Sequence, residues 1–167
     1  MTRKNLLERL REIKIIDKRE IKLRSGAVSS FYCDIKKVYG YPEVMNALVD
    51  LIKNKISKNI TCIAASGYGG IPLASVISSR LNKKLILVRE KPKKHGRGGY
   101  IDGYIPNKKD KIAIVDDVIT SGSSIRSTIR TLKKMKVKTS YAIVVVERRK
   151  VKLPIPYYFI FNVEEFY

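Results

Sequence analysis

The chain has 167 residues, 44% of them hydrophobic, which suits one globular domain around a single sizeable core and leaves no room for a second domain. Its 35 Lys and Arg against 15 Asp and Glu give a net charge of +20, spread along the sequence without an arginine-rich tail, zinc-finger spacing or RNP-like aromatic motif. We therefore rank a solubilising surface first, steering of small polyanions second and nucleic-acid binding a distant third.

The sequence also bears on where the protein works. The first residues, MTRKNLLERLREI, lack the apolar stretch of a signal peptide, and no run approaches the roughly 20 apolar residues of a membrane span. We expect a cytoplasmic protein that does not enter membranes. Cys33 and Cys62 have neither CxxC spacing nor a histidine cluster, which indicates no zinc site and no disulfide framework. Both should be buried or half-buried thiols.

The N-terminal part predicts a helix followed by a hairpin. Leu6, Leu10 and Ile13 recur at helical spacing between charged residues, which is typical of an amphipathic helix. We expect this helix to act as a lid or a flank. Alternation in Ile21–Leu23 indicates a strand, the letters RSG a turn, and Phe31–Tyr32 a second strand carrying aromatic side chains. From the residues alone, this segment is a structural hairpin.

The next segment predicts a helix, a strand and a second helix. Tyr41–Ile56 has Pro42 in its first turn and apolar residues on one face, so we expect a helix that packs on a sheet. Thr61–Ala65 is a short apolar run typical of a buried strand. The letters SGYGGIPLASVISSR then predict a glycine-rich turn into a helix, whose exposed amide groups could bind an anion.

A second buried strand, Leu85–Val88, leads into a segment of a different kind. The letters REKPKKHGRGGYIDGYIPNKKDK show no apolar periodicity, several glycines, many cations and the single histidine. Loops of this length inside a compact domain are usually functional lids or disordered, so we predict a mobile loop. Lys93 and His95 are two residues apart and would point the same way in an extended segment.

The most informative stretch is IAIVDDVITSGSSI. Ile112–Val115 predicts a strand buried on both faces, which places Asp116 and Asp117 at its carboxyl end, where open α/β sheets bind ligands. The following loop, Thr120–Ser124, supplies hydroxyls, a glycine for a tight turn and free amide groups at a helix start, all suited to a phosphate. The alternative is that the acids are strand-end polar residues and the loop an ordinary N-cap. Two adjacent acids are costly without a cation or donors, so we favour a phosphorylated sugar as ligand.

The remainder of the chain predicts one helix and two further strands. The helix after the phosphate loop has a buried stripe and a basic outer face, which is usually just solvated. Tyr141–Val146 predicts another buried strand, with Glu147–Arg148 at its carboxyl end, level with the two acids of the neighbouring strand. Pro154–Tyr167 indicates a last strand and a short polar end.

These motifs together resemble a known family. VDDVITSGSSI is similar to the phosphoribosyl diphosphate (PRPP) loop of type I phosphoribosyltransferases, and particularly of orotate phosphoribosyltransferases. Further family segments match the RSG turn with its aromatic pair, the letters GYGGIPLA, the cationic loop Arg89–Gly103 (the lid) and Arg148. The resemblance therefore spans nearly the whole chain. It implies a single domain over residues 1–167: an α/β type I phosphoribosyltransferase fold, with a mostly parallel central sheet flanked by helices, a small N-terminal hood and a flexible catalytic loop.

The resemblance also implies a reaction. Orotate and PRPP would give orotidine 5'-monophosphate and pyrophosphate in pyrimidine biosynthesis, with Mg²⁺ as cofactor and a homodimer in which the catalytic loop is shared between subunits. It implies catalytic roles for Lys93, His95 and Asp117, and places Mg²⁺ at Asp116 and Asp117, through water and PRPP. PRPP would contact Arg89, Lys93, His95, Tyr68, Gly69, Asp116, Asp117, Val118, Ile119, Thr120, Ser121, Gly122, Ser123 and Ser124. Orotate would contact Arg24, Phe31, Tyr32, Thr120 and Arg148.

Three positions depart from the family pattern. Arg24, Gly69 and Glu90 stand where the family usually, or in some members, has Lys. Arginine keeps the charge with a different donor geometry, whereas glycine and glutamate each remove a cationic contact. Two rival functions remain open: a phosphoribosyltransferase for another base, which would not need Arg148, and a non-catalytic PRPP-sensing regulator, which would not need the lid residues.

Overall fold

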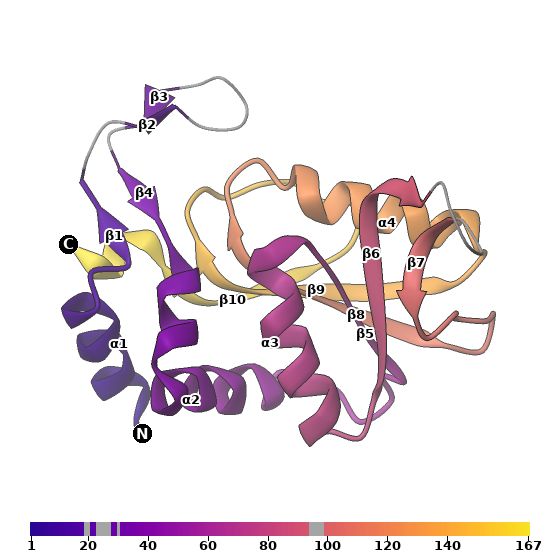
Figure 1. Ribbon diagram of the computed structural model, residues 1–167, viewed down its shortest axis with the longest axis horizontal. Coiled ribbons are helices and arrows are strands. Elements are labelled where there is room, and N and C mark those ends of the chain that lie inside the picture. Colours follow the sequence, from indigo (N-terminus) through magenta and orange to yellow (C-terminus); the bar gives the residue numbers. More distant parts are fainter. Residues whose placement is uncertain (19–20, 23–27, 30, 94–98) are drawn as a thin grey trace.

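The structure, a computed structural model, describes residues 1–18, 21–22, 28–29, 31–93 and 99–167 (Figure 1). Its centre is a six-stranded sheet in the order β10-β9-β8-β5-β6-β7. Neighbouring strands run parallel except β6 and β7, which are antiparallel. The strands are β5 (Cys62–Ser66), β6 (Lys84–Lys93), β7 (Gly99–Gly103), β8 (Lys111–Ile119), β9 (Lys138–Glu147) and β10 (Tyr157–Asn162).

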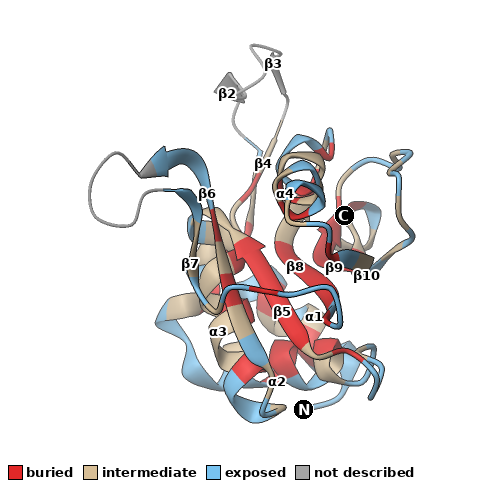
Figure 2. Cartoon of the chain, turned by 90° about the vertical axis from the view of Figure 1, so that its right-hand side faces the viewer, coloured by how far each residue is buried: buried red, intermediate tan, exposed pale blue. Residues whose placement is uncertain are grey.

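Helices cover both faces of this sheet, which is why the middle parts of its central strands are apolar. On β8, Ala113 and Val115 pack in one core cluster with the first three helices, whereas Ile112 and Ile114 pack in another cluster with the fourth. Figure 2 shows the resulting burial of the central strands. The helices are α1 (Arg3–Glu12), α2 (Pro42–Lys53), α3 (Gly67–Arg80) and α4 (Ser123–Lys134). The predicted mostly parallel sheet flanked by helices is thus confirmed.

The lid segment differs from the prediction. Instead of a structureless loop, β6 continues from the core to Lys93 and pairs with β7, with Lys93 opposite Gly99 and Val88 opposite Ile101. Residues 94–98, which include His95, lie outside the described part of the chain. The apolar periodicity of the sequence did not reveal these strands, because an exposed edge hairpin is held by backbone hydrogen bonds and tolerates charged side chains on both faces.

The N-terminal segment forms two small antiparallel sheets in place of the predicted single hairpin. One pairs β1 (Ile16–Asp17) with β4 (Tyr32–Cys33), and the other pairs β2 (Ile21–Lys22) with β3 (Val28–Ser29). The aromatic strand therefore pairs with residues before the Ile21 strand. Short 3-10 helices follow at η1 (Ile35–Gly40) and at η2 (Val163–Phe166) near the C-terminus.

The first helix is a flank and not a lid. Leu6 and Leu10 are buried in the core, and Arg3 forms a 2.6 Å ion pair with Glu165 of η2. The predicted polar end is thus a capped 3-10 helix, with Asn162 and Glu165 forming a capping box. Among the described residues, no helix has both the length and the apolarity needed to cross a bilayer.

Candidate active site

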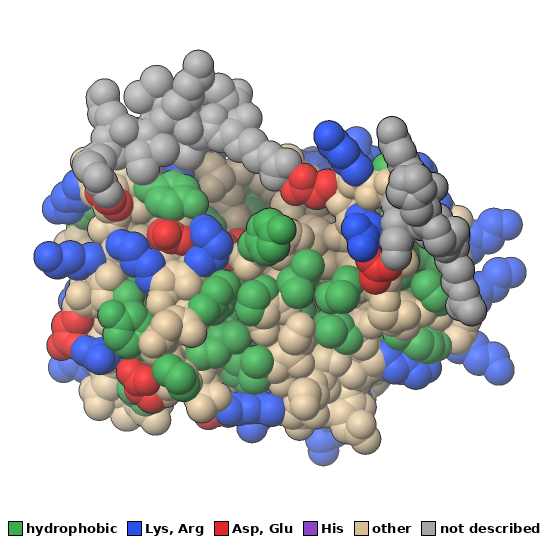
Figure 3. Space-filling view, viewed as in Figure 1, with side chains coloured by type: hydrophobic (Ala, Val, Ile, Leu, Met, Phe, Trp, Pro, Cys, Tyr) green, Lys and Arg blue, Asp and Glu red, His purple; other side chains and the backbone are tan. Residues whose placement is uncertain are grey.

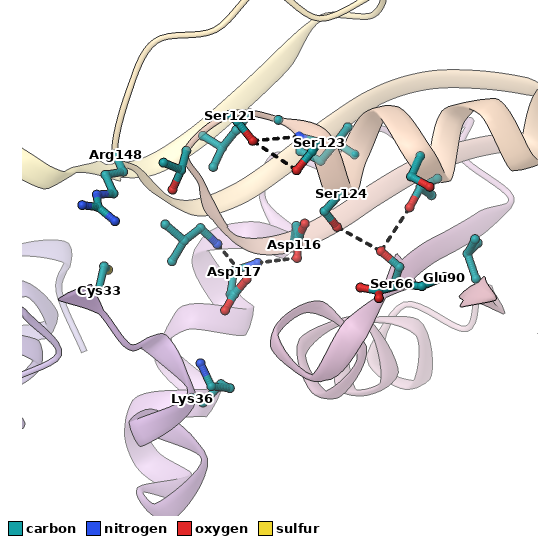
Figure 4. A pocket seen from close by; sticks show the side chains of 18 of the residues that line it. Cys33, Lys36, Ser66, Glu90, Asp116, Asp117, Ser121, Ser123, Ser124 and Arg148 are labelled. Carbon is teal, nitrogen blue, oxygen red and sulfur yellow. Dashed lines mark hydrogen bonds between the residues drawn. The ribbon is translucent and has the colours of Figure 1, made fainter. Parts of the chain in front are cut away.

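The described residues enclose a cavity of about 710 Å³ at the carboxyl ends of β5, β8 and β9. Such an edge is where α/β sheets bind ligands, because loops leave it towards helix N-termini. Figure 4 shows the side chains that point into this cavity. The lining consists of Tyr32, Cys33, Lys36, Ser66, Val88, Arg89, Glu90, Asp116, Asp117, Val118, Ile119, Thr120, Ser121, Gly122, Ser123, Ser124, Ile125, Ser127, Thr128, Arg130 and Arg148.

The two adjacent acids occupy different environments. Both lie within β8, which runs past them to Ile119. Asp116 is 7% exposed, and burial, followed by the charge of Asp117, raises the pKa of Asp116 to about 8. Its Oδ1 accepts the amide hydrogen of Asp117 at 3.1 Å, and Asp117 Oδ1 accepts that of Val118 at 2.9 Å. Burial thus favours the protonated form of Asp116, while the side chain of Asp117 lines the cavity.

The phosphate loop is pre-shaped by internal bonds. Gly122 takes a left-handed conformation with φ 74° at the start of α4, which side chains with a Cβ rarely adopt. Ser121 and Ser123 share a hydrogen bond of 3.1 Å, and the guanidinium of Arg126 donates to the Ser121 carbonyl and, at 2.7 Å, to the Lys152 carbonyl. The loop therefore needs little rearrangement to present amide and hydroxyl donors to an anion.

The hydroxyl of Ser66, at the end of β5, joins this loop to the neighbouring strand. It lies 3.0 Å from the hydroxyl of Ser124 and accepts a 3.1 Å hydrogen bond from Thr128 (Figure 4). Residues Ser66 and Thr128 were missed by the sequence analysis, because isolated hydroxyl residues carry no signal until the fold brings them together. They hold the start of α4 against β5.

The second glycine-rich loop lies against the acids. A Cβ at Gly69 would overlap the carboxylate of Asp117, and one at Gly70 would lie 2.7 Å from the Val115 carbonyl. The hydroxyl of Tyr39 donates to the Gly69 carbonyl. The side chain of Tyr68 is 90% exposed and lies outside the cavity lining, as does Gly69. Glycine is thus required at position 69 by the place of Asp117.

At the other end of the cavity lies a cationic group. The guanidinium of Arg148 lies 4.1 Å from the centre of the Phe31 ring and donates to the Phe31 carbonyl at 3.0 Å. Burial lowers the pKa of Arg148. Of the two predicted aromatic residues, Tyr32 lines the cavity, whereas Phe31 supports Arg148 from outside the lining. The Tyr167 ring packs edge-on against Phe31, 5.8 Å between centroids.

Glu147, the last residue of β9, lies at a different level of the sheet from the one predicted. Glu147 is opposite Ile119, further along β8 than the two acids. Its carboxylate is buried and accepts hydrogen bonds from the Tyr157 hydroxyl and, at 3.2 Å, from the Asn162 amide. Within the described residues Glu147 thus braces β10, while Arg148 reaches the cavity.

The lid contributes two described side chains. Arg89 and Glu90 line the cavity, and Arg89 forms an ion pair with Asp102 across the β6–β7 hairpin. The backbone of Lys93 ends β6, but its side chain, like the whole of His95 and Arg24, lies outside what the structure describes. The predicted contacts of these three residues stay predictions.

Two further lining residues were not predicted as part of a site. Cys33 is buried, and burial, followed by the negative charge of Asp117, raises the pKa of its thiol to about 12. Lys36 follows on η1, four residues after Tyr32, whose hydroxyl it contacts at 3.2 Å. The letters FYCDIKK carry no local signal for this contact, since Tyr32 lies on β4 and Lys36 on η1.

The described side chains could supply only some of the ligands that a divalent cation needs. Across the described residues no three His, Cys, Asp or Glu side chains gather as a metal cluster. Asp117 offers one carboxylate at the cavity, beside the buried Asp116. Because Mg²⁺ commonly keeps several waters and takes one or two carboxylates plus substrate phosphates, this donor set fits Mg²⁺ that arrives with a phosphorylated ligand.

Comparisons with known proteins agree with this geometry. The family model of the phosphoribosyl transferase domain matches residues 36–166. The orotate phosphoribosyltransferase of Pyrococcus horikoshii is 35% identical over 131 residues, which are 77% of this chain and 70% of that protein. That of Methanocaldococcus jannaschii is 32% identical over 143 residues, covering 86% and 81%.

A solved structure extends the similarity to the fold. The crystal structure of orotate phosphoribosyltransferase from Aeropyrum pernix superposes with a TM-score of 0.82 at 24% identity, covering 96% of this chain and 95% of that chain. The family match over most of the sequence, the archaeal relatives and this superposition agree with one another. The chain belongs to the phosphoribosyltransferase family.

Proposed function

We propose that the chain is an orotate phosphoribosyltransferase, which transfers the phosphoribosyl group of PRPP to orotate in pyrimidine biosynthesis. The products are orotidine 5'-monophosphate and pyrophosphate. One observation carries this function: a single cavity holds a preformed phosphate loop, an acidic pair and, at its other end, the guanidinium of Arg148. A planar guanidinium suits a carboxylate, and orotate is the pyrimidine base that bears one. The archaeal relatives named above have this activity in their names.

The phosphate loop and the acids support the placing of PRPP. We assign the 5'-phosphate to Thr120–Ser124, whose amide groups begin α4, and the backbone of Val118–Ile119 to the adjoining ribose. The carboxylate oxygens of Asp117 would accept hydrogen bonds from the ribose hydroxyls, while Asp116, when protonated, can also donate one. Tyr68 and Gly69, at the start of α3, would meet the pyrophosphate through backbone amides.

Mg²⁺ would enter with PRPP. When bound, it would neutralise pyrophosphate charge and help the leaving group depart. The residues that we assign to it are Asp117 and, through water, Asp116. The raised pKa of Asp116 limits the negative charge that the protein itself places beside the incoming phosphates.

In the proposed reaction, a bond forms between orotate N1 and the anomeric carbon as the bond from that carbon to pyrophosphate oxygen breaks, and the proton of N1 leaves with the pyrophosphate. Positive charge develops on the sugar, and Asp117 is placed to stabilise it. Arg89, Lys93 and His95 would neutralise the departing pyrophosphate. Closure of the lid would exclude water, which could otherwise hydrolyse PRPP.

On the base side, we assign the orotate carboxylate to Arg148. Tyr32 would contact the ring from the cavity wall, and Thr120 a polar edge. Phe31 supports this guanidinium, and its contact with the base stays part of the proposal. Arg24 remains proposed as a cover for the base on the grounds of its motif alone.

The decisive assay mixes the protein with orotate, PRPP and Mg²⁺ and follows the loss of orotate absorbance, with release of pyrophosphate measured in parallel. We expect turnover that requires all three components. Adenine and hypoxanthine in place of orotate serve as controls for another base. Turnover of a purine but not of orotate, or tight PRPP binding without turnover of any base, would replace the proposed function by one of the two rivals.

We further propose that residues 1–167 form one cytoplasmic domain and act as a homodimer, in which the lid of each subunit closes over the partner's site. Figure 3 shows hydrophobic side chains gathered over the middle of one face, in the region of α3, with Lys and Arg around its margins. An apolar area ringed by charge is typical of protein contact surfaces, and scattered cations do not favour a nucleic-acid partner.

Mixing two inactive variants tests the shared lid. Lys93→Ala and Asp117→Asn should each fold and lose activity. If the site combines residues of two subunits, subunit exchange produces mixed dimers with one doubly defective and one intact site, so activity partly returns. A mixture that stays inactive after exchange has been verified would show that each lid serves its own subunit.

A further inference from the structure

Lys36 is a cavity-lining cation to which the reaction described so far gives no part. It lies on η1, and Figure 4 shows Cys33 between Arg148 on one side and Lys36 on the other, with Asp117 beside them. The pKa of the Cys33 thiol is raised chiefly by burial, but also responds to the charges of Asp117, Arg148 and Lys36. The two cations therefore flank one part of the cavity.

The ammonium of Lys36 is held in place by its neighbours. It donates to the Tyr32 hydroxyl at 3.2 Å and lies 2.7 Å from Oδ1 of Asp34. Burial alone would lower the pKa of Lys36, but these two bonds outweigh it and raise the pKa, so the group stays charged. An ammonium has three donors, and these contacts use two of them. The third can serve a ligand in the cavity.

The contacts of Lys36 are of modest value to the fold. Its side chain is 39% exposed and that of Asp34 26%, and ion pairs at such positions contribute little stability. The next residue, Lys37, is directed elsewhere, and its ammonium donates to the Lys14 carbonyl at 2.8 Å. Lys37 has the same charge and neighbours in sequence but does not line the cavity. It provides a matched control.

The chemistry of orotate places two polar groups around its reacting atom. N1 is flanked by C6, which bears the carboxylate, and by C2, which bears a carbonyl oxygen. If N1 faces the ribose held at Asp117 and the carboxylate meets Arg148, the C2 oxygen turns to the opposite side, where Lys36 lies. Loss of the N1 proton places negative charge on that oxygen, which an ammonium would stabilise.

We propose that Lys36 is a second orotate-binding cation, which contacts the C2 carbonyl oxygen opposite to the carboxylate held by Arg148. The inference rests on the proposed orotate activity. Lys36 forms no covalent bond and accepts no proton. It orients the base and stabilises the charge on the C2 oxygen while N1 attacks.

The test compares Lys36→Met with Lys37→Met. A lost hydrogen bond to a charged group predicts about tenfold to hundredfold weaker binding of orotidine 5'-monophosphate by calorimetry, with a matching rise in the KM for orotate. The KM for PRPP should change little. Lys37→Met should bind and react like the unmodified protein, and Lys36→Arg should recover part of the loss.

A change in the substrate separates contact from structure, and its first measurement needs only the unmodified protein. In the unmodified protein, 2-thio-orotate should react more slowly than orotate, since sulfur is a weak acceptor. In Lys36→Met this difference should largely disappear, because the partner of the C2 group has been removed.

Each failure can be told apart. If the unmodified protein does not convert orotate, the proposed function fails, whatever Lys36 does. If it converts orotate and Lys36→Met behaves like Lys37→Met, or raises both KM values equally, Lys36 does not contact the base. Equal rates for orotate and its 2-thio analogue in the unmodified protein, or additive losses from the two changes, would also overturn the inference.

Discussion

Gly69→Ala is expected to inactivate the enzyme without unfolding it. The added Cβ would overlap both oxygens and the carboxyl carbon of Asp117. All three distances would be well below 3.0 Å, and real Cβ atoms essentially never make contacts that short. To reach van der Waals distance, the carboxylate must move by about 1 Å or more. A displacement of that size in a catalytic group costs about a hundredfold in rate, or about 2.7 kcal/mol of transition-state stabilisation.

The assay separates this displacement from damage to the fold. Position 69 lies in the first turn of α3, and alanine is the better helix former by up to about 1 kcal/mol, so the midpoint of thermal unfolding should not fall. The quantity to measure is kcat/KM for PRPP at saturating orotate. Gly40→Ala is the matched control, because a Cβ there meets no atom within 4 Å in the described structure.

Two results would refute the reasoning. Full activity in Gly69→Ala would show that Asp117 can turn away at no cost, and its present position would then not be the catalytic one. An equal loss in Gly40→Ala would show that a glycine replacement acts through backbone stiffness.

Three further predictions follow from the charged groups. Arg148→Ala should weaken orotate binding by about tenfold to hundredfold in calorimetry, as for a lost charge-assisted bond, while the affinity for PRPP barely changes. Because the pKa of Asp116 is raised to about 8, the native state keeps a proton that the unfolded chain releases near pH 3.8, so urea denaturation should show stability falling as pH rises from about 4 to 8. Asp116→Asn should abolish that decline. Burial would raise the pKa of Asp110, but bonds from Asn107, Thr61 and Tyr104 outweigh it and lower the pKa to about 2, so its contribution should be lost as pH falls from about 4 to 2. Asp110→Asn should destabilise the protein at neutral pH by about 1 to 3 kcal/mol while kcat stays unchanged.

The outcomes that would contradict these predictions are distinct. Equal losses of affinity for both substrates in Arg148→Ala would remove it from the base subsite. A stability profile in Asp116→Asn that keeps the decline between pH 4 and 8 would assign the proton to another group. A loss of activity in Asp110→Asn would show that the amino end of β8, remote from the cavity, still controls the site.

The central site could be predicted from sequence because its signals are local. Ile112–Val115 is an apolar run of strand length, and the acids and the glycine-bearing loop follow within a few residues. The order of such elements along one chain limits the fold to a parallel sheet with helices on both faces. The same continuity makes the phosphate loop the most specific part of the family resemblance.

What could not be predicted depends on pairing between distant segments. That Phe31 supports Arg148, and that Lys36 lies across from it, requires the segment around β4 and η1 to meet the residue after β9, which no local pattern encodes. The raised pKa of Asp116 likewise depends on burial. Asp116 is covered by the first turn of α3, where Gly70 approaches it.

The lid hairpin is an extension of the core strand β6, so its base is fixed in the central sheet while its outer part projects beyond it. From Lys84 to Val88, β6 pairs with β5, whereas the register with β7 shifts between Val88 and Lys93. The inner half of β6 pairs with β5 on one side and β7 on the other, whereas its outer half pairs only with β7 among the described residues. Bending can therefore concentrate at the register shift, so that the rate of opening can be tuned at Arg89–Pro92 without weakening the core.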